Sequence, residues 1–136
     1  EYNDNYGHQQ GDKCLERIAA VIKQIAEENR IFCARYGGDE FVIIYKDVTR
    51  EQITAFAAEL KRRVMSQQIE HRYSKALPVV TVSQGICWDI PRKGNKMWDF
   101  LHSADNMLYR VKKFSRNNYC VGDVKETDDM IFGTLQ

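Results

Sequence analysis

Two adjacent carboxylates, Asp39 and Glu40, directly follow a pair of glycines, Gly37 and Gly38. Glycine has no Cβ and tolerates a positive φ, so paired glycines favour a tight turn whose backbone a ligand can approach closely. Carboxylate oxygens are hard ligands, and Mg²⁺ is commonly bound by one or two carboxylates together with substrate phosphates. The four residues therefore indicate either a site for Mg²⁺ carrying a polyphosphate or a solvent-exposed hairpin turn.

The residues on both sides of this turn predict two β-strands. Residues 31–36 are mostly apolar and aromatic, and residues 41–45 are β-branched and aromatic. Two such runs separated by a short segment that begins with glycine are typical of a β-hairpin. Successive side chains of a strand point to opposite faces, so Asp39 and Glu40 need not share a role.

Three separate blocks of sequence resemble the GGDEF family, the diguanylate cyclases. Residues 35–42 (RYGGDEFV) resemble the family signature, and residues 3–12 (NDNYGHQQGD) are similar to its N-D-x-[YF]-G-H-x-x-G-D segment. Residues 104–117 (ADNMLYRVKKFSRN) are similar to its closing A-D-x-x-L-Y-x-x-K-x-x-x-R-N. The resemblance covers residues 1 to about 121 and implies an α+β, palm-like fold, with a mixed, largely antiparallel sheet flanked by helices.

The resemblance implies an enzyme that condenses two GTP molecules into cyclic di-GMP and two pyrophosphates, for bacterial second-messenger signalling. It implies that Asp39 is a catalytic ligand of Mg²⁺ (or Mn²⁺). It also implies that Glu40 helps to activate the attacking hydroxyl or binds a second metal. Gly37 and Gly38 would let the backbone of the turn pass close to the nucleotide.

Four further residues match substrate-binding positions of the family. Asn3 and Asp12 are implied to contact the guanine base, because an amide and a carboxylate can together read its O6 and N1/N2 edge. Lys112 and Arg116 are implied to grip the terminal phosphates. Asp12 has an alternative role as a helix N-cap, and the two cations have an alternative role at a helix C-terminus, where they share a face if the helix continues that far.

Hydrophobic periodicity predicts the remaining elements. Residues 1–12 are expected to form a helix end and a loop, and a helix is expected from Asp12 to about Ala26. A second helix is expected to begin at a capping box at Thr49, and a third is expected over residues 97–114. Strands are expected over residues 78–87 and 119–124, with Gly85 at a bulge or a close approach. Residues 1–124 would form the catalytic domain, and residues 125–136 a C-terminal tail.

Composition excludes two broad classes. The formal net charge is +1, with 20 basic and 19 acidic residues, which argues against a nucleic-acid binder. No apolar run approaches a membrane span, so we expect a cytoplasmic domain without membrane contact, in a protein that an upstream segment could tether. The four cysteines form no C-x-x-C pair and are expected to be free thiols, with a disulfide or a zinc site as the alternative.

The sequence departs from the family pattern in two places. The family's first strand and its acidic turn, which supplies another metal carboxylate, would precede residue 1, so the prediction of activity concerns the full-length protein. Residues 28–31 (ENRI) stand where many members carry an R-x-x-D product-binding site, so feedback inhibition by cyclic di-GMP at that position is not expected.

Catalysis in this family needs two facing domains, so the resemblance implies a homodimer, with an N-terminal sensory or dimerisation domain as a partner. One alternative is a catalytically silent domain that binds GTP or cyclic di-GMP and regulates an attached effector domain. Another is a structural dimerisation domain, which would leave the six charged and polar site residues unexplained.

Overall fold

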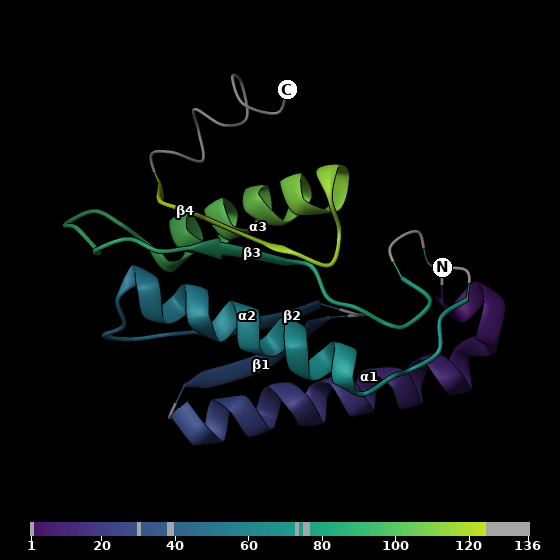
Figure 1. Cartoon of the computed structure of the whole chain (residues 1–136). Coiled ribbons are helices and arrows are strands. Elements are labelled where there is room, and N and C mark those ends of the chain that lie inside the picture. The colour runs from purple at the N-terminus through teal and green to yellow at the C-terminus, as the bar shows by residue number, and fades with distance from the viewer. Residues whose placement is uncertain (1, 30, 38–39, 73, 75–76, 125–136) are drawn as a thin grey trace. The chain divides into compact units, whose positions relative to one another are not determined.

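The computed structural model describes residues 2–29, 31–37, 40–72, 74 and 77–124 (Figure 1). The chain divides into two compact units, residues 1–81 and residues 82–136. The first unit contains α1 (Tyr2–Asn29), β1 (Phe32–Gly37), β2 (Glu40–Ile44) and α2 (Arg50–Ser66). The second contains β3 (Gln84–Cys87), α3 (Met97–Phe114) and β4 (Tyr119–Gly122).

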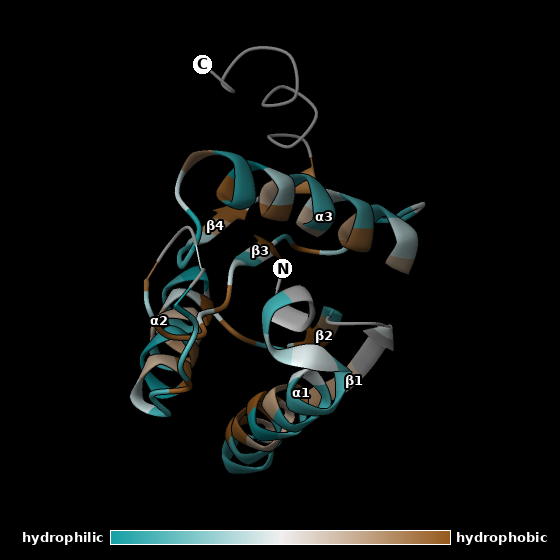
Figure 2. Cartoon of the chain, turned by 90° about the vertical axis from the view of Figure 1, so that its right-hand side faces the viewer, coloured by the Kyte–Doolittle hydropathy of each residue, from teal (hydrophilic) through white to brown (hydrophobic). Residues whose placement is uncertain are grey.

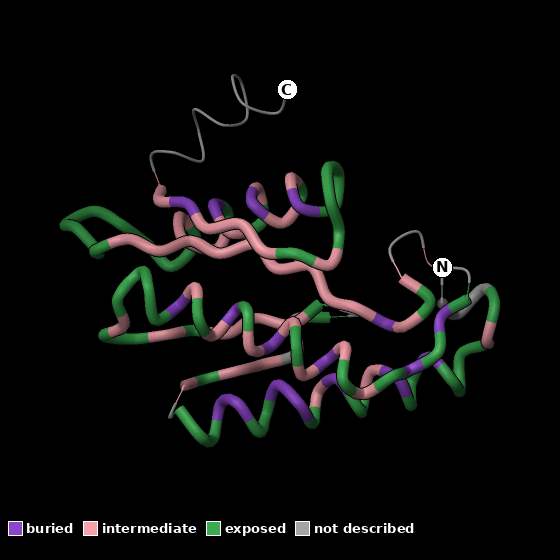
Figure 3. Tube along the Cα trace, in the orientation of Figure 1, coloured by how far each residue is buried: buried purple, intermediate pink, exposed green. Residues whose placement is uncertain are grey.

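Helix α1 begins earlier than the sequence predicts. It starts at Tyr2, and Gly7 interrupts it with φ 84° and ψ 164°, which are not helical values. Glycine adopts a positive φ without a Cβ clash, which permits this break at Gly7, whereas Gly11 lies within the helix. The alternative role of Asp12 as a helix N-cap is wrong, because Asp12 lies inside α1 beyond the break. After the break, buried positions recur turn after turn along the helix (Figure 3).

Strands β1 and β2 form the predicted antiparallel hairpin. Phe32 pairs with Ile44 at the open end, and Gly37 pairs with Glu40 next to the turn. The register shifts between Arg35 and Gly37, so the strand is irregular just before the glycine pair. The hairpin therefore brings the end of β1 and the start of β2 together at the signature turn.

Helix α2 begins at the predicted capping box. The Gln52 N–H donates to the Thr49 hydroxyl at 3.0 Å, and the Thr49 N–H donates to the Gln52 side chain at 2.8 Å. The buried face contains Ile53, Ala57 and Leu60, together with Val64. Brown, hydrophobic positions alternate with teal, hydrophilic ones along α2 in Figure 2. The predicted helix is thus confirmed in its start and in its buried face.

The strand predicted over residues 78–87 is shorter in the structure. Its first part turns back on the segment after α2, where the Val80 N–H donates to the Ile69 carbonyl at 2.7 Å. The His71 N–H likewise donates to the Pro78 carbonyl at 2.8 Å. We call these two arms, residues 69–72 and 78–80, the 69–80 hook. Only from Gln84 does the chain pair with β4 as a strand.

In the second unit, β3 and β4 are parallel and α3 connects them. The described strands thus form one antiparallel and one parallel pair, whereas the sequence predicts a largely antiparallel sheet. The parallel pairing follows from the strand–helix–strand order, since a helical crossover returns the chain to run in the same direction. The α+β class is as predicted.

Gly85 lies directly under α3. A Cβ built on Gly85 would lie 2.2 Å from the Ala104 carbonyl oxygen and 2.2 Å from the Leu108 backbone nitrogen. The predicted close approach at Gly85 is therefore confirmed. The face of α3 toward the strands contains Ser103, Met107 and Val111, all buried.

The four cysteines are free, as predicted. Burial raises the pKa of the Cys14 thiol, and it raises the pKa of Cys87 to about 11. The thiol of Cys120 lies 3.4 Å from the sulfur of Met107, which is 1% exposed. Within the described ranges, no helix has both the length and the apolar character that crossing a membrane requires.

Candidate functional site

The hairpin turn is the centre of the predicted site. Gly37 ends β1, Glu40 begins β2, and both are exposed. A Cβ built on Gly37 would find no atom within 4 Å, so the space beside this backbone is open. Gly38 and Asp39 lie outside the described residues. The Glu40 carboxylate is thus an exposed hard-oxygen donor at a turn that no described side chain crowds, and this fits a cation carried by a triphosphate.

Asn3 and Asp12 lie on the two sides of the break in α1. Asn3 belongs to the short turn before Gly7, and its side chain lies outside the described set. Asp12 lies on the long part of the helix, next to the buried Gly11, and is exposed. The relation between the two residues therefore depends on how the short turn is held across Gly7.

Lys112 and Arg116 flank the end of α3 in the second unit, and both are exposed. The two residues would share a helix face only if the helix continued to residue 116, and that condition is not met, because α3 ends at Phe114. The N–H groups of Ser115 and Arg116 both donate to the Val111 carbonyl, at 3.0 Å and 2.8 Å, and close the helix.

Arg116 then adopts φ 53° and Asn117 adopts φ 44°, the left-handed conformation that commonly follows a helix. Glycine is the usual residue in this conformation, and an arginine there is uncommon. The left-handed backbone, and not a continuing helix, thus sets the direction in which the Arg116 side chain leaves the chain.

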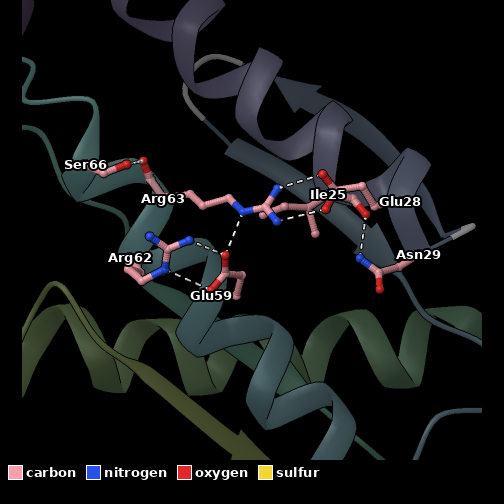
Figure 4. Close-up of polar contacts among 7 residues, drawn as sticks. All are labelled: Ile25, Glu28, Asn29, Glu59, Arg62, Arg63 and Ser66. Carbon is pink, nitrogen blue, oxygen red and sulfur yellow. Dashed lines mark hydrogen bonds and ion pairs between the residues drawn. The ribbon is translucent and has the colours of Figure 1, made fainter.

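The segment that replaces the family's R-x-x-D motif takes part in an ion-pair network (Figure 4). The Arg63 guanidinium donates to both carboxylate oxygens of Glu28, at 2.8 Å and 3.3 Å. Arg63 also donates to Glu59 at 2.8 Å, and Arg62 pairs with Glu59 at 2.5 Å. Hydrogen bonds from the two arginines hold the pKa of Glu59 at about 2. At the position of the motif's arginine, this chain thus has an acid, Glu28, which pairs with Arg63 of α2.

The described residues contain no group of three or more His, Cys, Asp or Glu side chains arranged to hold a metal ion. Asp39, the residue to which the resemblance assigns the metal, lies outside them. Of the two carboxylates predicted to hold a metal, Glu40 is the one that the structure describes.

Sequence reasoning missed two sets of contacts. One is the pairing of Glu28 with Arg63, which joins residues 35 positions apart on two helices. A local signal was present, because Glu59 precedes Arg62 and Arg63 by three and four residues on one helix. The other is the contact of Tyr6 with the 69–80 hook, where the Arg72 N–H donates to the Tyr6 hydroxyl at 3.0 Å. No local pattern connects those residues.

Residues 1–118 match the family model described as diguanylate cyclase, GGDEF domain. The chain belongs to the GGDEF domain family. The match spans the hairpin turn, both parts of α1 and the end of α3, so it includes every site residue named above.

Relatives of this GGDEF domain include named cyclases. It is 32% identical over 116 residues to diguanylate cyclase A of Treponema denticola, covering 85% of this chain and 30% of that protein. It is 29% identical over 116 residues to diguanylate cyclase VdcA of Vibrio cholerae, covering 85% of this chain and 33% of that protein. The chain thus spans about a third of the length of these two relatives.

A solved structure has a similar fold. It is the coiled coil and GGDEF domain of DgcB from Caulobacter crescentus, in complex with c-di-GMP, with a TM-score of 0.76 at 30% identity. The likeness covers 89% of this chain and 62% of that one. The palm-like α+β fold implied by the sequence is therefore confirmed.

Proposed function

We propose that this GGDEF domain, in its full-length protein, is a diguanylate cyclase that condenses two GTP molecules into cyclic di-GMP and two pyrophosphates. The family match and the cyclase relatives support a role in cyclic di-GMP metabolism. The single observation that carries the enzyme reading is the signature turn. Gly37 and Glu40 pair at the tip of an antiparallel hairpin, with open space beside the backbone and an exposed carboxylate.

Two partial reactions lead to the product. In each, the 3′-oxygen of one GTP forms a bond to the α-phosphorus of the other, and the bond from that phosphorus to pyrophosphate breaks. The proton of the 3′-hydroxyl leaves to a base, and Glu40, which is exposed at the start of β2, would accept it. Positioning and electrostatics supply most of the catalysis in such transfers.

The chain's own residues would bind and orient the nucleotide. Asp39 and Glu40 would hold Mg²⁺ (or Mn²⁺), and that ion supplies charge neutralisation at the triphosphate when bound. Asn3 and Asp12 would bind the guanine edge. Lys112 and Arg116 would bind the terminal phosphates, as exposed cations at the end of α3. Gly37 and Gly38 would leave room for the nucleotide along the backbone.

Each domain would supply one bound GTP, so the active form would be a homodimer of facing domains. An N-terminal partner region would bring the domains together, and the solved DgcB structure includes a coiled coil beside its GGDEF domain. The domain would act in the cytoplasm, where GTP is available.

The experiment is incubation of the full-length protein with GTP and Mg²⁺, with the product identified by chromatography and mass spectrometry. Cyclic di-GMP and pyrophosphate are the expected products. GTP binding by a verified dimer without any product would refute the proposal and support the catalytically silent alternative.

A further inference from the structure

We propose that Tyr6 is a positioning residue for the guanine subsite, because it docks the short N-terminal turn of α1 on the 69–80 hook. This turn carries Asn3, which the proposed function assigns to the guanine base. The inference rests on that proposed function and adds the residue that fixes its base-binding geometry.

The turn needs an anchor from outside its own helix. Gly7 departs from helical geometry with φ 84° and ψ 164°, so the hydrogen-bond ladder of α1 does not continue through it. A single helical turn is marginal by itself, since forming the first turn fixes several residues for one hydrogen bond. The direction of residues 2–6 is therefore set by tertiary contacts.

Tyr6 makes such contacts with the hook. Its hydroxyl accepts a hydrogen bond from the Arg72 N–H at 3.0 Å. Its ring meets the His71 ring edge to face, with centroids 6.1 Å apart and an interplanar angle of 79°. His71 is 9% exposed, so the ring on which Tyr6 packs is itself buried in the first unit. An edge-to-face pair of rings and a hydrogen bond to a backbone N–H together fix both the position and the rotation of the Tyr6 side chain.

The hook is itself held in place. Its two arms are joined by the hydrogen bonds of Val80 to Ile69 and of His71 to Pro78, at 2.7 Å and 2.8 Å. Ile69 and Val80 are both buried. Figure 1 shows this teal segment after α2 running along α1 toward its N-terminal end. The hook is therefore a supported surface on which the turn can dock.

The connection to α1 continues beyond the break. The Arg17 guanidinium donates to the carbonyl of Gln67, two residues before the hook, at 3.0 Å. Arg17 lies on the long part of α1 and Tyr6 on the short part, and Asp12 lies between them in the sequence. The segment from Gln67 to the hook thus spans the Gly7 break and sets the turn with Asn3 relative to the helix with Asp12.

This arrangement predicts a specific defect when the Tyr6 anchor is weakened. Base recognition by an amide and a carboxylate requires both groups to be held within about 0.5 Å of the productive geometry. Movement of the turn should therefore reduce selectivity for guanine over adenine, since adenine carries a donor where guanine carries the O6 acceptor. A change that lowers only stability would leave the selectivity ratio of the folded protein intact.

The test compares Tyr6→Phe and Tyr6→Leu with a matched control, Tyr45→Phe, in the full-length protein. Tyr45 also has a half-buried ring, but this ring lies just after β2 and stacks on Phe56 of α2, with centroids 5.2 Å apart. Calorimetry would measure the affinities for 3′-deoxy-GTP and 3′-deoxy-ATP with Mg²⁺, since neither analogue has the hydroxyl needed for turnover.

We expect Tyr6→Phe to lower the affinity for the guanine analogue by about 2- to 10-fold, the value of one hydrogen bond, and to reduce the guanine-to-adenine ratio. Tyr6→Leu should have the larger effect, and Tyr45→Phe should match the wild type. If Tyr6→Leu does not fold, Tyr6→Phe still tests the inference, because it keeps the aromatic ring and removes only the hydroxyl. A wild-type ratio in Tyr6→Phe, or a wild type that does not prefer guanine, would overturn the inference. The proposed function is judged separately, by whether the wild type forms cyclic di-GMP.

Discussion

The guanidinium of Arg63 binds the carboxylate of Glu28 through two hydrogen bonds, of 2.8 Å and 3.3 Å, that join α2 to α1. Glu28 stands where many GGDEF proteins carry the arginine of their R-x-x-D product site. The acid therefore adds negative charge at this position and engages a cation of α2, which opposes the binding of a bis-phosphate ligand there.

The first prediction is that cyclic di-GMP at micromolar concentration does not inhibit the full-length protein through residues 28–31. Initial rates of product formation, measured with and without added product, should be equal. Glu28→Gln removes the charge, and Lys23→Gln, at an exposed position on the same helix, is the control. Inhibition that disappears when residues 28–31 are substituted would contradict this prediction.

The second prediction concerns acid stability. The pKa of Glu59 lies at about 2 in the folded protein, below its ordinary value of 4.5, because Arg62 and Arg63 hydrogen-bond its carboxylate. A lowered folded pKa contributes stability above the unfolded pKa, and that contribution is lost as pH falls through the folded pKa. The stabilising effect of Glu59 should thus be complete at pH 7 and decline between about pH 4.5 and pH 2.

The measurement is the urea midpoint of the wild type and of Glu59→Gln at several pH values. The difference between the two proteins should be largest at neutral pH and shrink toward pH 2. The effect should be small, since the Glu59 side chain is partly exposed and solvent screens its ion pairs. A difference that stays constant with pH would show that the glutamate acts through packing alone.

The third prediction is that Gly85→Ala strongly destabilises the domain. The added Cβ would lie 2.2 Å from backbone atoms of both Ala104 and Leu108, and a helix backbone cannot move aside as a flexible side chain can. Forcing extra atoms into such a contact typically costs about 1–3 kcal/mol or more. Urea denaturation would measure the loss.

Gly37→Ala is the matched stability control, because a Cβ at that position meets nothing within 4 Å. Its free energy of unfolding should remain close to that of the wild type. Equal stability of Gly85→Ala and Gly37→Ala would refute the close approach of β3 to α3.

Local signals predicted the elements that depend on nearby residues. The capping pair of Thr49 and Gln52 gave the start of α2, and apolar spacing gave α3 with the bounds observed, Met97–Phe114. The glycine pair between two β-branched runs gave the hairpin. In each case the interactions that decide the structure lie within a few residues of one another.

Long-range contacts explain the predictions that were wrong. Residues 78–80 read as part of a strand, but they pair with residues 69–71, and no local pattern indicates that pairing. The hydrogen bond of Tyr6 joins residues 66 positions apart. Arg116 lies beyond the end of α3 in a left-handed conformation that favours glycine, and no local pattern predicts that conformation for an arginine. Sequence motifs predicted which residues belong to the candidate site. The connections of α1 to the hook and to α2 came from the structure alone.

The assignment of the signature turn is tested most directly by cyclic di-GMP formation in Asp39→Ala and Glu40→Ala, measured beside the wild type in the full-length protein. Lys46→Ala, at an exposed position after β2, is the control. We expect both acidic variants to lose more than about 100-fold in rate, as when a preorganised electrostatic group is removed. Their thermal unfolding should be unchanged, because Glu40 is exposed at the start of β2 and Asp39 is its neighbour in the sequence. Product formation at the wild-type rate in either variant would contradict the catalytic role of that residue.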